Sequence, residues 1–117
     1  GKRILVVEDD LINYQYLHAL LSKTGATVIH VKNGEDAIEA ATIERAADLI
    51  LLDIQLPFKS GIEATIEIRK INKQIPIIAQ TATDSEYVSA CRDAGCNAFV
   101  TKPIDPDELL NLIKRFL

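Results

Sequence analysis

The sequence predicts an α/β protein built on an open, doubly wound parallel sheet. Short apolar runs alternate with helical patterns five times along the 117 residues. Such alternation favours right-handed crossovers and a parallel sheet. Residues 48–53 hold four consecutive apolar residues, which is typical of a central strand covered on both faces. Five units are too few for an eight-stranded barrel. We therefore expect a three-layer, flavodoxin-like sandwich with strand order 2-1-3-4-5, forming one domain over residues 1–117.

Runs of β-branched residues and leucine predict the strands, because these side chains fit the pleated, buried surface of a sheet. The expected strands cover residues 3–7, 27–31, 48–53, 77–80 and 97–101. Pro76 stands directly before the fourth run, where the missing backbone N–H of proline is tolerated. The third run is the most apolar of the five, so we place it in the middle of the sheet.

A helical pattern follows each strand. The first expected helix starts at Asp10 or Leu11 and ends at Lys23, and the others cover residues 35–46, 60–71, 84–94 and 105–116. In the first helix the apolar residues recur every three or four positions, which predicts one buried face. That face holds Leu11, Tyr14, Leu17, Leu20 and Leu21. Gly25 and Gly95 are expected to end the first and fourth helices, since glycine adopts a left-handed backbone readily.

Capping residues mark the starts of two helices. Ser60 and Glu63 have the spacing of a capping box, in which each side chain binds a free backbone N–H of the first turn. Asp105 before Pro106 combines an N-cap residue with proline at the first helical position. The dipeptide Asn33-Gly34 predicts a turn in front of the second helix.

The composition is that of an ordinary globular domain. Hydrophobic residues make up 48% of the chain and charged residues 26%, which argues against disorder. The formal net charge of −4 argues against binding of nucleic acid or an anionic membrane surface through bulk positive charge. No apolar run approaches the roughly 20 residues of a membrane helix, and no secretory signal is visible. We expect a cytoplasmic domain.

The cysteines and histidines predict no site of their own. Cys91 and Cys96 are five positions apart, which is neither a CxxC redox pair nor a metal-binding pair. We expect both to be reduced, as in a cytosolic protein. His18 and His30 stand far from each other, and each is expected to be a surface or partly packed residue rather than a ligand or a base.

Acidic residues end two strands that the predicted fold places side by side. Glu8, Asp9 and Asp10 follow the first strand, and Asp53 ends the third. In this fold ligands bind at the carboxyl ends of these strands, where the strand order reverses. Clustered carboxylates repel one another, and a divalent cation relieves the repulsion. Oxygen ligands without His or Cys favour Mg²⁺. Asp10 suits the N-cap of the first helix equally well.

The fourth and fifth strands add a hydroxyl and an ammonium group to the same end of the sheet. Thr81 follows the fourth strand, and Lys102 follows the fifth. A phosphoryl group in transfer spreads negative charge over its oxygens, which Mg²⁺, Lys102 and the Thr81 hydroxyl can each neutralise. Asp53 is then the nucleophile that forms an aspartyl phosphate. Neither a Walker-type phosphate loop nor a dinucleotide-binding glycine motif is present.

Four motifs together resemble the receiver domain of two-component response regulators. They lie at residues 4–10, at 48–53 with Pro57 and Gly61, at 76–82 and at 98–103. These motifs cover essentially the whole chain, and in combination they are very specific. The resemblance implies a signalling phosphoacceptor that catalyses only its own phosphorylation and dephosphorylation.

The resemblance assigns a role to each residue around the metal. Asp53 would be the phosphoacceptor, and Asp9 would bind Mg²⁺ directly while Glu8 acts mostly through water. Gln55 would offer its backbone carbonyl to the metal. The family usually has a Met-Pro-x-Met-Asp-Gly run after the acceptor, whereas this chain has Gln55 to Gly61 with Lys59 near the site. This departure leaves the lifetime of the phosphate open.

The resemblance also implies a switch. Thr81 would be the hydroxyl that moves toward the phosphoryl group, and Lys102 would bind that group. Phe99 would be the aromatic residue whose ring turns into the space that Thr81 leaves, although an aromatic residue on such a strand is also an ordinary core residue. The peptide bond Lys102-Pro103 would be cis, as is seen before proline. The surface of the fourth helix, fifth strand and fifth helix would change.

Finer details are similar to receivers fused to hybrid sensor histidine kinases. Asn13 takes the place where DNA-binding regulators more often have a basic residue, and Pro103-Ile104-Asp105 follows Lys102. The implied partners are a histidine kinase or a histidine phosphotransfer domain, contacted by the first helix and the loop after the fifth strand. We expect neither direct nucleic-acid binding nor membrane contact, and a monomer or a weak phosphorylation-dependent dimer. The domain would be cytoplasmic, or the cytosolic part of a membrane-bound hybrid kinase.

Several alternatives remain. A stand-alone or effector-linked receiver has the same site residues. Phosphatases of the haloacid-dehalogenase type also use an aspartate nucleophile with Mg²⁺, but they need a second aspartate where this chain has Gln55. A pseudo-receiver would lack Asp53 or Lys102, and both are present. An FMN-binding flavodoxin would have a Ser/Thr-rich loop after the first strand, which is missing here.

Overall fold

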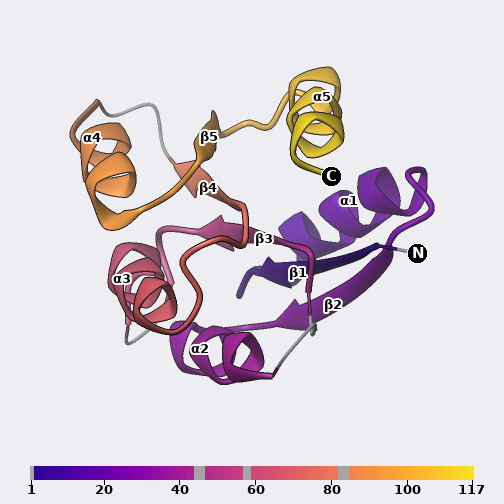
Figure 1. The fold of residues 1–117 in the computed structure, drawn as a ribbon. Coiled ribbons are helices and arrows are strands. Elements are labelled where there is room, and N and C mark those ends of the chain that lie inside the picture. Colours follow the sequence, from indigo (N-terminus) through magenta and orange to yellow (C-terminus); the bar gives the residue numbers. More distant parts are fainter. Residues whose placement is uncertain (1, 44–46, 57–58, 82–84) are drawn as a thin grey trace.

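The computed structural model describes residues 2–43, 47–56, 59–81 and 85–117. Strands and helices alternate along the chain, as the sequence predicts (Figure 1). The elements are β1 (Arg3–Val7), α1 (Leu11–Ser22), β2 (Thr27–Val31), α2 (Gly34–Thr42), β3 (Leu49–Asp53), α3 (Gly61–Ile71), β4 (Ile77–Thr81), α4 (Ser85–Ala94), β5 (Ala98–Thr101) and α5 (Pro106–Phe116). All strands are parallel in the order β2-β1-β3-β4-β5, so the predicted fold class is confirmed.

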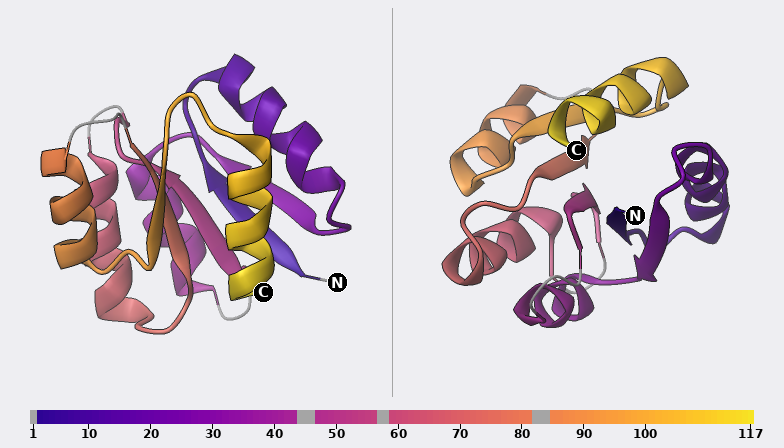
Figure 2. Two further views of the ribbon diagram at one scale, coloured as in Figure 1. Left: turned by 90° about the horizontal axis from the view of Figure 1, so that it is seen from above. Right: turned by 45° about the vertical axis from the view of Figure 1, so that its right-hand side comes forward.

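Two cores fill the space between the sheet and its helices. Helices α1 and α5 cover one face of the sheet, and α2, α3 and α4 cover the other (Figure 2). Strand β1 shows why: Ile4 and Val6 join the α1/α5 core, whereas Leu5 and Val7 join the opposite core. Alternate side chains of a strand point to opposite faces, so a strand between two helical layers is apolar throughout.

Strand β3 holds the central position that its composition predicts. All five of its residues are buried, including Asp53 at its carboxyl end. It pairs with β1 on one side and β4 on the other, and Val7 lies opposite Leu52. The ends of β1 and β3 therefore lie next to each other at one end of the sheet, which we call the carboxyl end.

Most helix caps are confirmed. The Ser60 hydroxyl accepts a hydrogen bond from the Glu63 N–H at 3.2 Å, and Asp105 caps α5 by accepting from the Asp107 N–H at 3.0 Å. Asn33 differs from the prediction, because it caps α2 directly by accepting from the Asp36 N–H at 2.8 Å. Asn33-Gly34 is thus the start of the helix and not a separate turn.

Two further expectations need correction or lie partly outside the described residues. Helix α2 ends at Thr42, whereas the prediction continued it to residue 46. Residues 44–46 lie outside the described part of the chain, and so does residue 84, the predicted start of the fourth helix. Leu11 does not belong to the buried face of α1, because 60% of it is exposed. The fully buried residues of α1, Leu17, Leu20 and Leu21, lie in its second half, and Tyr14 is partly buried against the same core.

Candidate functional site

Three carboxylates meet at the carboxyl end of the sheet. Glu8 and Asp9 follow β1, Asp53 ends β3, and one oxygen of each lies within 4.8 Å of the others. Glu8 is 0% and Asp53 2% exposed, whereas Asp9 is exposed. Neighbouring strands bring these residues together, as the sequence predicts. A buried cluster with one ligand open to solvent has the donors and the access that a Mg²⁺ ion requires.

Glu8 is held toward its protonated form by its surroundings. Burial, together with the neighbouring Asp53 carboxyl, raises the pKa of Glu8 to about 7. Hydrogen bonds from the side chain of Asn13 and the backbone N–H of Asp10 act in the opposite direction. A divalent cation would restore the ionised form of Glu8, so the residues present fit a bound Mg²⁺ ion.

Asp53 has a different partner on each oxygen. Its Oδ2 forms an ion pair with the Lys102 Nζ at 3.0 Å, and its Oδ1 accepts a hydrogen bond from the Gln55 N–H at 2.9 Å. The carboxylate is held in one orientation with a cation beside it. Lys102 thus takes the position expected from the sequence. The Gln55 side chain is exposed, and the role of its carbonyl toward a metal stays a prediction.

The predicted switch residues lie on the neighbouring strands β4 and β5. Thr81 ends β4, is 1% exposed, and its carbonyl accepts a hydrogen bond from the Lys102 N–H at 2.9 Å. Phe99 on β5 is half-buried and packs against a cluster that contains Ala79 and Cys91. The Lys102-Pro103 peptide bond is cis, as the resemblance implied. Pro57, part of the second motif, lies outside the described residues.

Asp10 and Lys59 have other roles. Asp10 caps α1 by accepting hydrogen bonds from the N–H groups of Ile12 and Asn13 at 2.9 and 3.2 Å. The Lys59 ammonium, in the loop before α3, pairs at 3.1 Å with Glu35 in the first turn of α2. Of the two readings of Asp10, the structure supports the cap, and the charge of Lys59 is neutralised by Glu35.

Sequence reasoning missed two amides that support Glu8. The Asn13 Nδ2 donates to the Glu8 Oε1 and also to the Gln80 Oε1, the latter at 3.2 Å. Gln80 is 0% exposed and lies in β4, opposite Asp53 in the sheet. The signal was present in the sequence, because Gln80 is a polar residue inside an apolar run at a central strand.

His30 is partly packed, as expected, and it lies close to the site. Its ring stacks on Tyr14 with the centroids 3.6 Å apart and the planes within 5°. The His30 Nε2–H donates to the backbone carbonyl of Glu8 at 2.7 Å. His30 thereby joins β2 and α1 to the end of β1. The free thiol of Cys91 is buried, which raises its pKa to about 12 and leaves it a packing residue.

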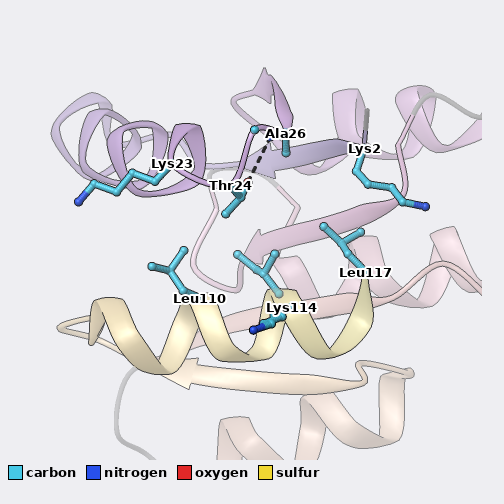
Figure 3. Close-up of a pocket in the computed structure, with 9 residues that line it drawn as sticks. Lys2, Lys23, Thr24, Ala26, Leu110, Lys114 and Leu117 are labelled. Carbon is cyan, nitrogen blue, oxygen red and sulfur yellow. Dashed lines mark hydrogen bonds between the residues drawn. The ribbon is translucent and has the colours of Figure 1, made fainter.

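A separate cavity of about 580 Å³ lies at the opposite end of the sheet, between α1 and α5 (Figure 3). Its floor is apolar, and its charged lining residues are Lys2, Lys23 and Lys114. It holds none of the predicted site residues, so the chemistry of the carboxyl end does not extend to it. Within the described residues, no helix is both long enough and apolar enough to cross a membrane.

Comparison with known proteins agrees with the geometry. The sequence model of the response regulator receiver domain matches residues 4–114. The polar-differentiation response regulator DivK of Brucella anthropi is 36% identical over 99% of this chain and 96% of its own length. The hybrid signal transduction histidine kinase M of Dictyostelium discoideum is 37% identical over 97% of this chain, which spans only 5% of that protein.

The solved structures include close matches to the fold. One is the receiver domain of the sensor histidine kinase PA1611 from Pseudomonas aeruginosa, whose active site cleft holds a coordinated magnesium ion. It is 36% identical, covers 99% of this chain and 97% of its own, and superposes with a TM-score of 0.91. Fold, acidic cluster and relatives agree, and this chain belongs to the response regulator receiver domains, the phosphoacceptor domains of two-component signalling.

Proposed function

We propose that Asp53 accepts a phosphoryl group from a phosphohistidine of a partner protein, with Mg²⁺ bound beside it. The observation that carries this proposal is the position of Asp53, which shares the carboxylate cluster with Glu8 and Asp9 and pairs with Lys102 at 3.0 Å. In the reaction an oxygen of the Asp53 carboxylate forms a bond to phosphorus while the bond from phosphorus to the histidine nitrogen breaks. The leaving nitrogen keeps the electron pair and takes a proton.

The residues around Asp53 neutralise and orient the group in transfer. Asp9, Asp53 and the Gln55 carbonyl would hold Mg²⁺, with Glu8 acting mostly through water, and the ion would neutralise charge on the phosphoryl oxygens. Lys102 already contacts the acceptor carboxylate, and it would bind a phosphoryl oxygen as the Asp53 carboxylate becomes part of the acyl phosphate. No general base is needed, since a carboxylate is already ionised.

The phosphoryl group would act as a switch through Thr81 and Phe99. The Thr81 hydroxyl would turn toward the new oxygens, and the Phe99 ring would move into the space released. Phe99 lines a cavity of about 240 Å³ that also involves α4, β5 and Leu112 of α5. Room for a rearrangement therefore exists next to the ring, on the surface that α4, β5 and α5 share.

The partner is a histidine kinase or a histidine phosphotransfer domain, which is the class of protein that receiver domains contact. The first turns of α1 expose Leu11, Ile12 and Tyr16. The Tyr16 hydroxyl donates to the carbonyl of Ile104 at 3.2 Å, which joins this patch to the loop after β5. An exposed apolar patch beside the acceptor suits docking of the helix that carries the histidine.

We favour a phosphorelay receiver of the hybrid type, cytoplasmic or on the cytosolic side of a membrane-bound kinase, in which residues 1–117 form a single receiver domain. Relatives of both kinds are similar to this chain. It spans 96% of the length of the response regulator DivK but only 5% of the length of the hybrid kinase M. A stand-alone regulator is the alternative. The domain is proposed to be monomeric or weakly dimeric, without nucleic-acid or membrane contact and without enzymatic activity beyond its own phosphorylation and dephosphorylation.

Intact-mass spectrometry tests the proposed function. Incubation with acetyl phosphate and Mg²⁺ should add one phosphoryl group to the protein, and chelation of Mg²⁺ should prevent the gain. The Asp53→Asn variant should gain none. If instead the protein gained no phosphoryl group and also bound no beryllofluoride, the proposal that Asp53 is a phosphoacceptor would be wrong. Transfer to purified phosphotransfer domains would then separate a relay receiver from a stand-alone regulator.

A further inference from the structure

Gln80 is a polar residue in a place that suits an apolar one. It lies in β4, an interior strand of the sheet between β3 and β5, and is completely buried. In the part of the chain that the structure describes, its Nε2 is a buried side-chain nitrogen without a hydrogen-bond partner. An unpaired amide nitrogen destabilises a core, and an apolar side chain of the same size would avoid that cost. Gln80 therefore destabilises the fold, so the reason for its presence must lie in the contact that its amide oxygen makes.

The Gln80 Oε1 connects to the acidic cluster through Asn13. It accepts a hydrogen bond from the Asn13 Nδ2 at 3.2 Å, and the same nitrogen donates to the Glu8 Oε1. An amide nitrogen carries two hydrogens, so Asn13 can hold both bonds at once. Because Asn13 uses its nitrogen toward both neighbours, Gln80 must present its oxygen to Asn13. This orientation leaves the Gln80 nitrogen facing the core.

We propose that Gln80 and Asn13 are positioning residues of the magnesium site: Gln80 orients the Asn13 amide, and Asn13 fixes the Glu8 carboxylate. This inference rests on the proposed function, in which the cluster binds Mg²⁺. The second Glu8 oxygen, Oε2, accepts from the Asp10 N–H at 3.3 Å, so both oxygens of the carboxylate are restrained. Hydrogen bonds of this kind, one step outside the metal ligands, orient those ligands and strengthen metal binding.

The chemistry of the pair suits this task. Both side chains are neutral, so they orient Glu8 without adding a cation that competes with the metal. A basic residue at position 13 would instead form an ion pair with Glu8. The pair also joins α1 to β4, so the position of Glu8 at the end of β1 depends on two other elements. Gln80 lies next to Thr81 in the chain, yet it acts on the carboxylates that would hold Mg²⁺ and not on the switch.

The experiment measures Mg²⁺ affinity without any phosphodonor, by titration of amide resonances in ¹H–¹⁵N spectra, together with the thermal midpoint of the metal-free protein. Wild type, Gln80→Leu, Asn13→Ala and the double variant are compared. Gln80→Leu should weaken Mg²⁺ binding by about three- to tenfold. Its midpoint should stay equal to that of the wild type or rise, because the unpaired nitrogen is gone. The double variant should bind Mg²⁺ no more weakly than Asn13→Ala alone.

Ile78→Val is the matched control. Ile78 is buried on the same strand, two positions before Gln80, and belongs to the α1/α5 core. This variant should lower the midpoint and leave the Mg²⁺ affinity unchanged, which separates packing from positioning. Gln80→Met serves as a second variant if Gln80→Leu does not give a folded protein.

Three outcomes would overturn the inference. Mg²⁺ affinity equal to that of the wild type in Gln80→Leu would show that Gln80 does not position the site. Losses that multiply in the double variant would show that Gln80 does not act through Asn13. A wild-type protein that shows no saturable Mg²⁺ binding would overturn the proposed function together with this inference, whereas the first two outcomes leave the proposed function intact.

Discussion

The two ends of the parallel sheet hold their charged groups in opposite settings. At the carboxyl end, Glu8 and Asp53 are 0% and 2% exposed, and Lys102 is paired with Asp53. At the amino end, Lys2 and Lys23 are exposed around the cavity of Figure 3, and neither is in an ion pair with any described residue. Buried charges cost free energy unless a partner or ligand compensates them, whereas exposed charges are solvated. The comparison shows that the carboxyl end keeps buried charged groups although they lower the stability of the fold.

The two ends also differ in backbone packing. At the carboxyl end, Gly61 begins α3 with its N–H bound to the Ile54 carbonyl at 2.7 Å. A Cβ at Gly61 would lie 2.4 Å from the Asp53 carbonyl oxygen and 2.6 Å from the Ile54 Cα. At the amino end, a Cβ at Gly25 would meet nothing within 4 Å, although its φ of +79° favours glycine.

The largest expected effect comes from Gly61→Ala. The methyl group cannot fit unless α3 moves away from the end of β3, so the free energy of unfolding should fall by about 3 kcal/mol or more. Gly25→Ala should cost only about 1 kcal/mol, from backbone strain alone. Chemical denaturation of both variants measures the difference. Equal losses would contradict the claim that the carboxyl end is the more tightly packed of the two.

The next effect is the pH dependence that Glu8 imparts. Its folded pKa of about 7 lies above the ordinary 4.5, so between these values the folded state binds more protons than the unfolded state. Stability of the metal-free protein should therefore fall as pH rises from about 4.5 through 7, by roughly 2–3 kcal/mol from this group. Glu8→Gln should remove this contribution and be more stable than wild type at pH 8.

Denaturation curves at several pH values, with and without Mg²⁺, measure the effect of Glu8. Mg²⁺ should raise the stability of wild type at pH 8, since binding to the folded state alone stabilises it. Glu8→Gln should respond less to Mg²⁺. The matched control is Asp48→Asn, an exposed acid whose Oδ2 accepts from the Arg3 N–H at 2.8 Å at the amino end. A pH dependence retained in Glu8→Gln would contradict the assignment to Glu8.

A smaller effect separates the lysines of the two ends. Lys102→Gln removes the cation beside the Asp53 carboxylate, so phosphorylation by acetyl phosphate should slow by about tenfold or more. Lys23→Gln at the rim of the cavity should change the rate by less than about twofold, because nothing reactive lies there. Time courses by mass spectrometry provide both rates. A similar slowing in the two variants would show that long-range charge, and not the contact with Asp53, sets the rate.

The smallest effect is a spectral change in the switch. Thr81→Ala should still accept a phosphoryl group, but the aromatic resonances of Phe99 should no longer shift when beryllofluoride binds. Thr101 lies opposite Thr81 in the sheet, and Thr101→Ala should keep that shift. If the Phe99 resonances of Thr81→Ala shifted as in the wild type, the proposed coupling between Thr81 and Phe99 would be contradicted.

The fold could be predicted from the sequence because the pattern of each element is local. The apolar run of β3 indicated a central strand, and Asp105-Pro106 indicated a helix start, without knowledge of any distant contact. The exposure of Leu11 could not be predicted in this way. Its spacing fits the same helical face as Leu17 and Leu21, and only the tertiary structure shows that this face does not pack against the core at Leu11.

The site residues likewise fall into those that the sequence could predict and those that it could not. Glu8 and Asp53 were predictable because the strand order brings the ends of β1 and β3 together. The amides of Asn13 and Gln80 were not, since they are 67 residues apart and their hydrogen bond depends on side-chain orientation. Gln80 in an apolar strand was the available signal, and a polar residue at such a position indicates a partner to be found in the structure.

The most direct test of the central claim is to locate the phosphoryl group chemically. Protein treated with acetyl phosphate and Mg²⁺ is reduced with borohydride, which converts an aspartyl phosphate to homoserine, and its peptides are sequenced by mass spectrometry. The account predicts homoserine at position 53, only when Mg²⁺ is present, and unchanged aspartate at Asp48 of the opposite end. Homoserine at Asp9, or a stable phosphoryl group on His18 or His30, would contradict it.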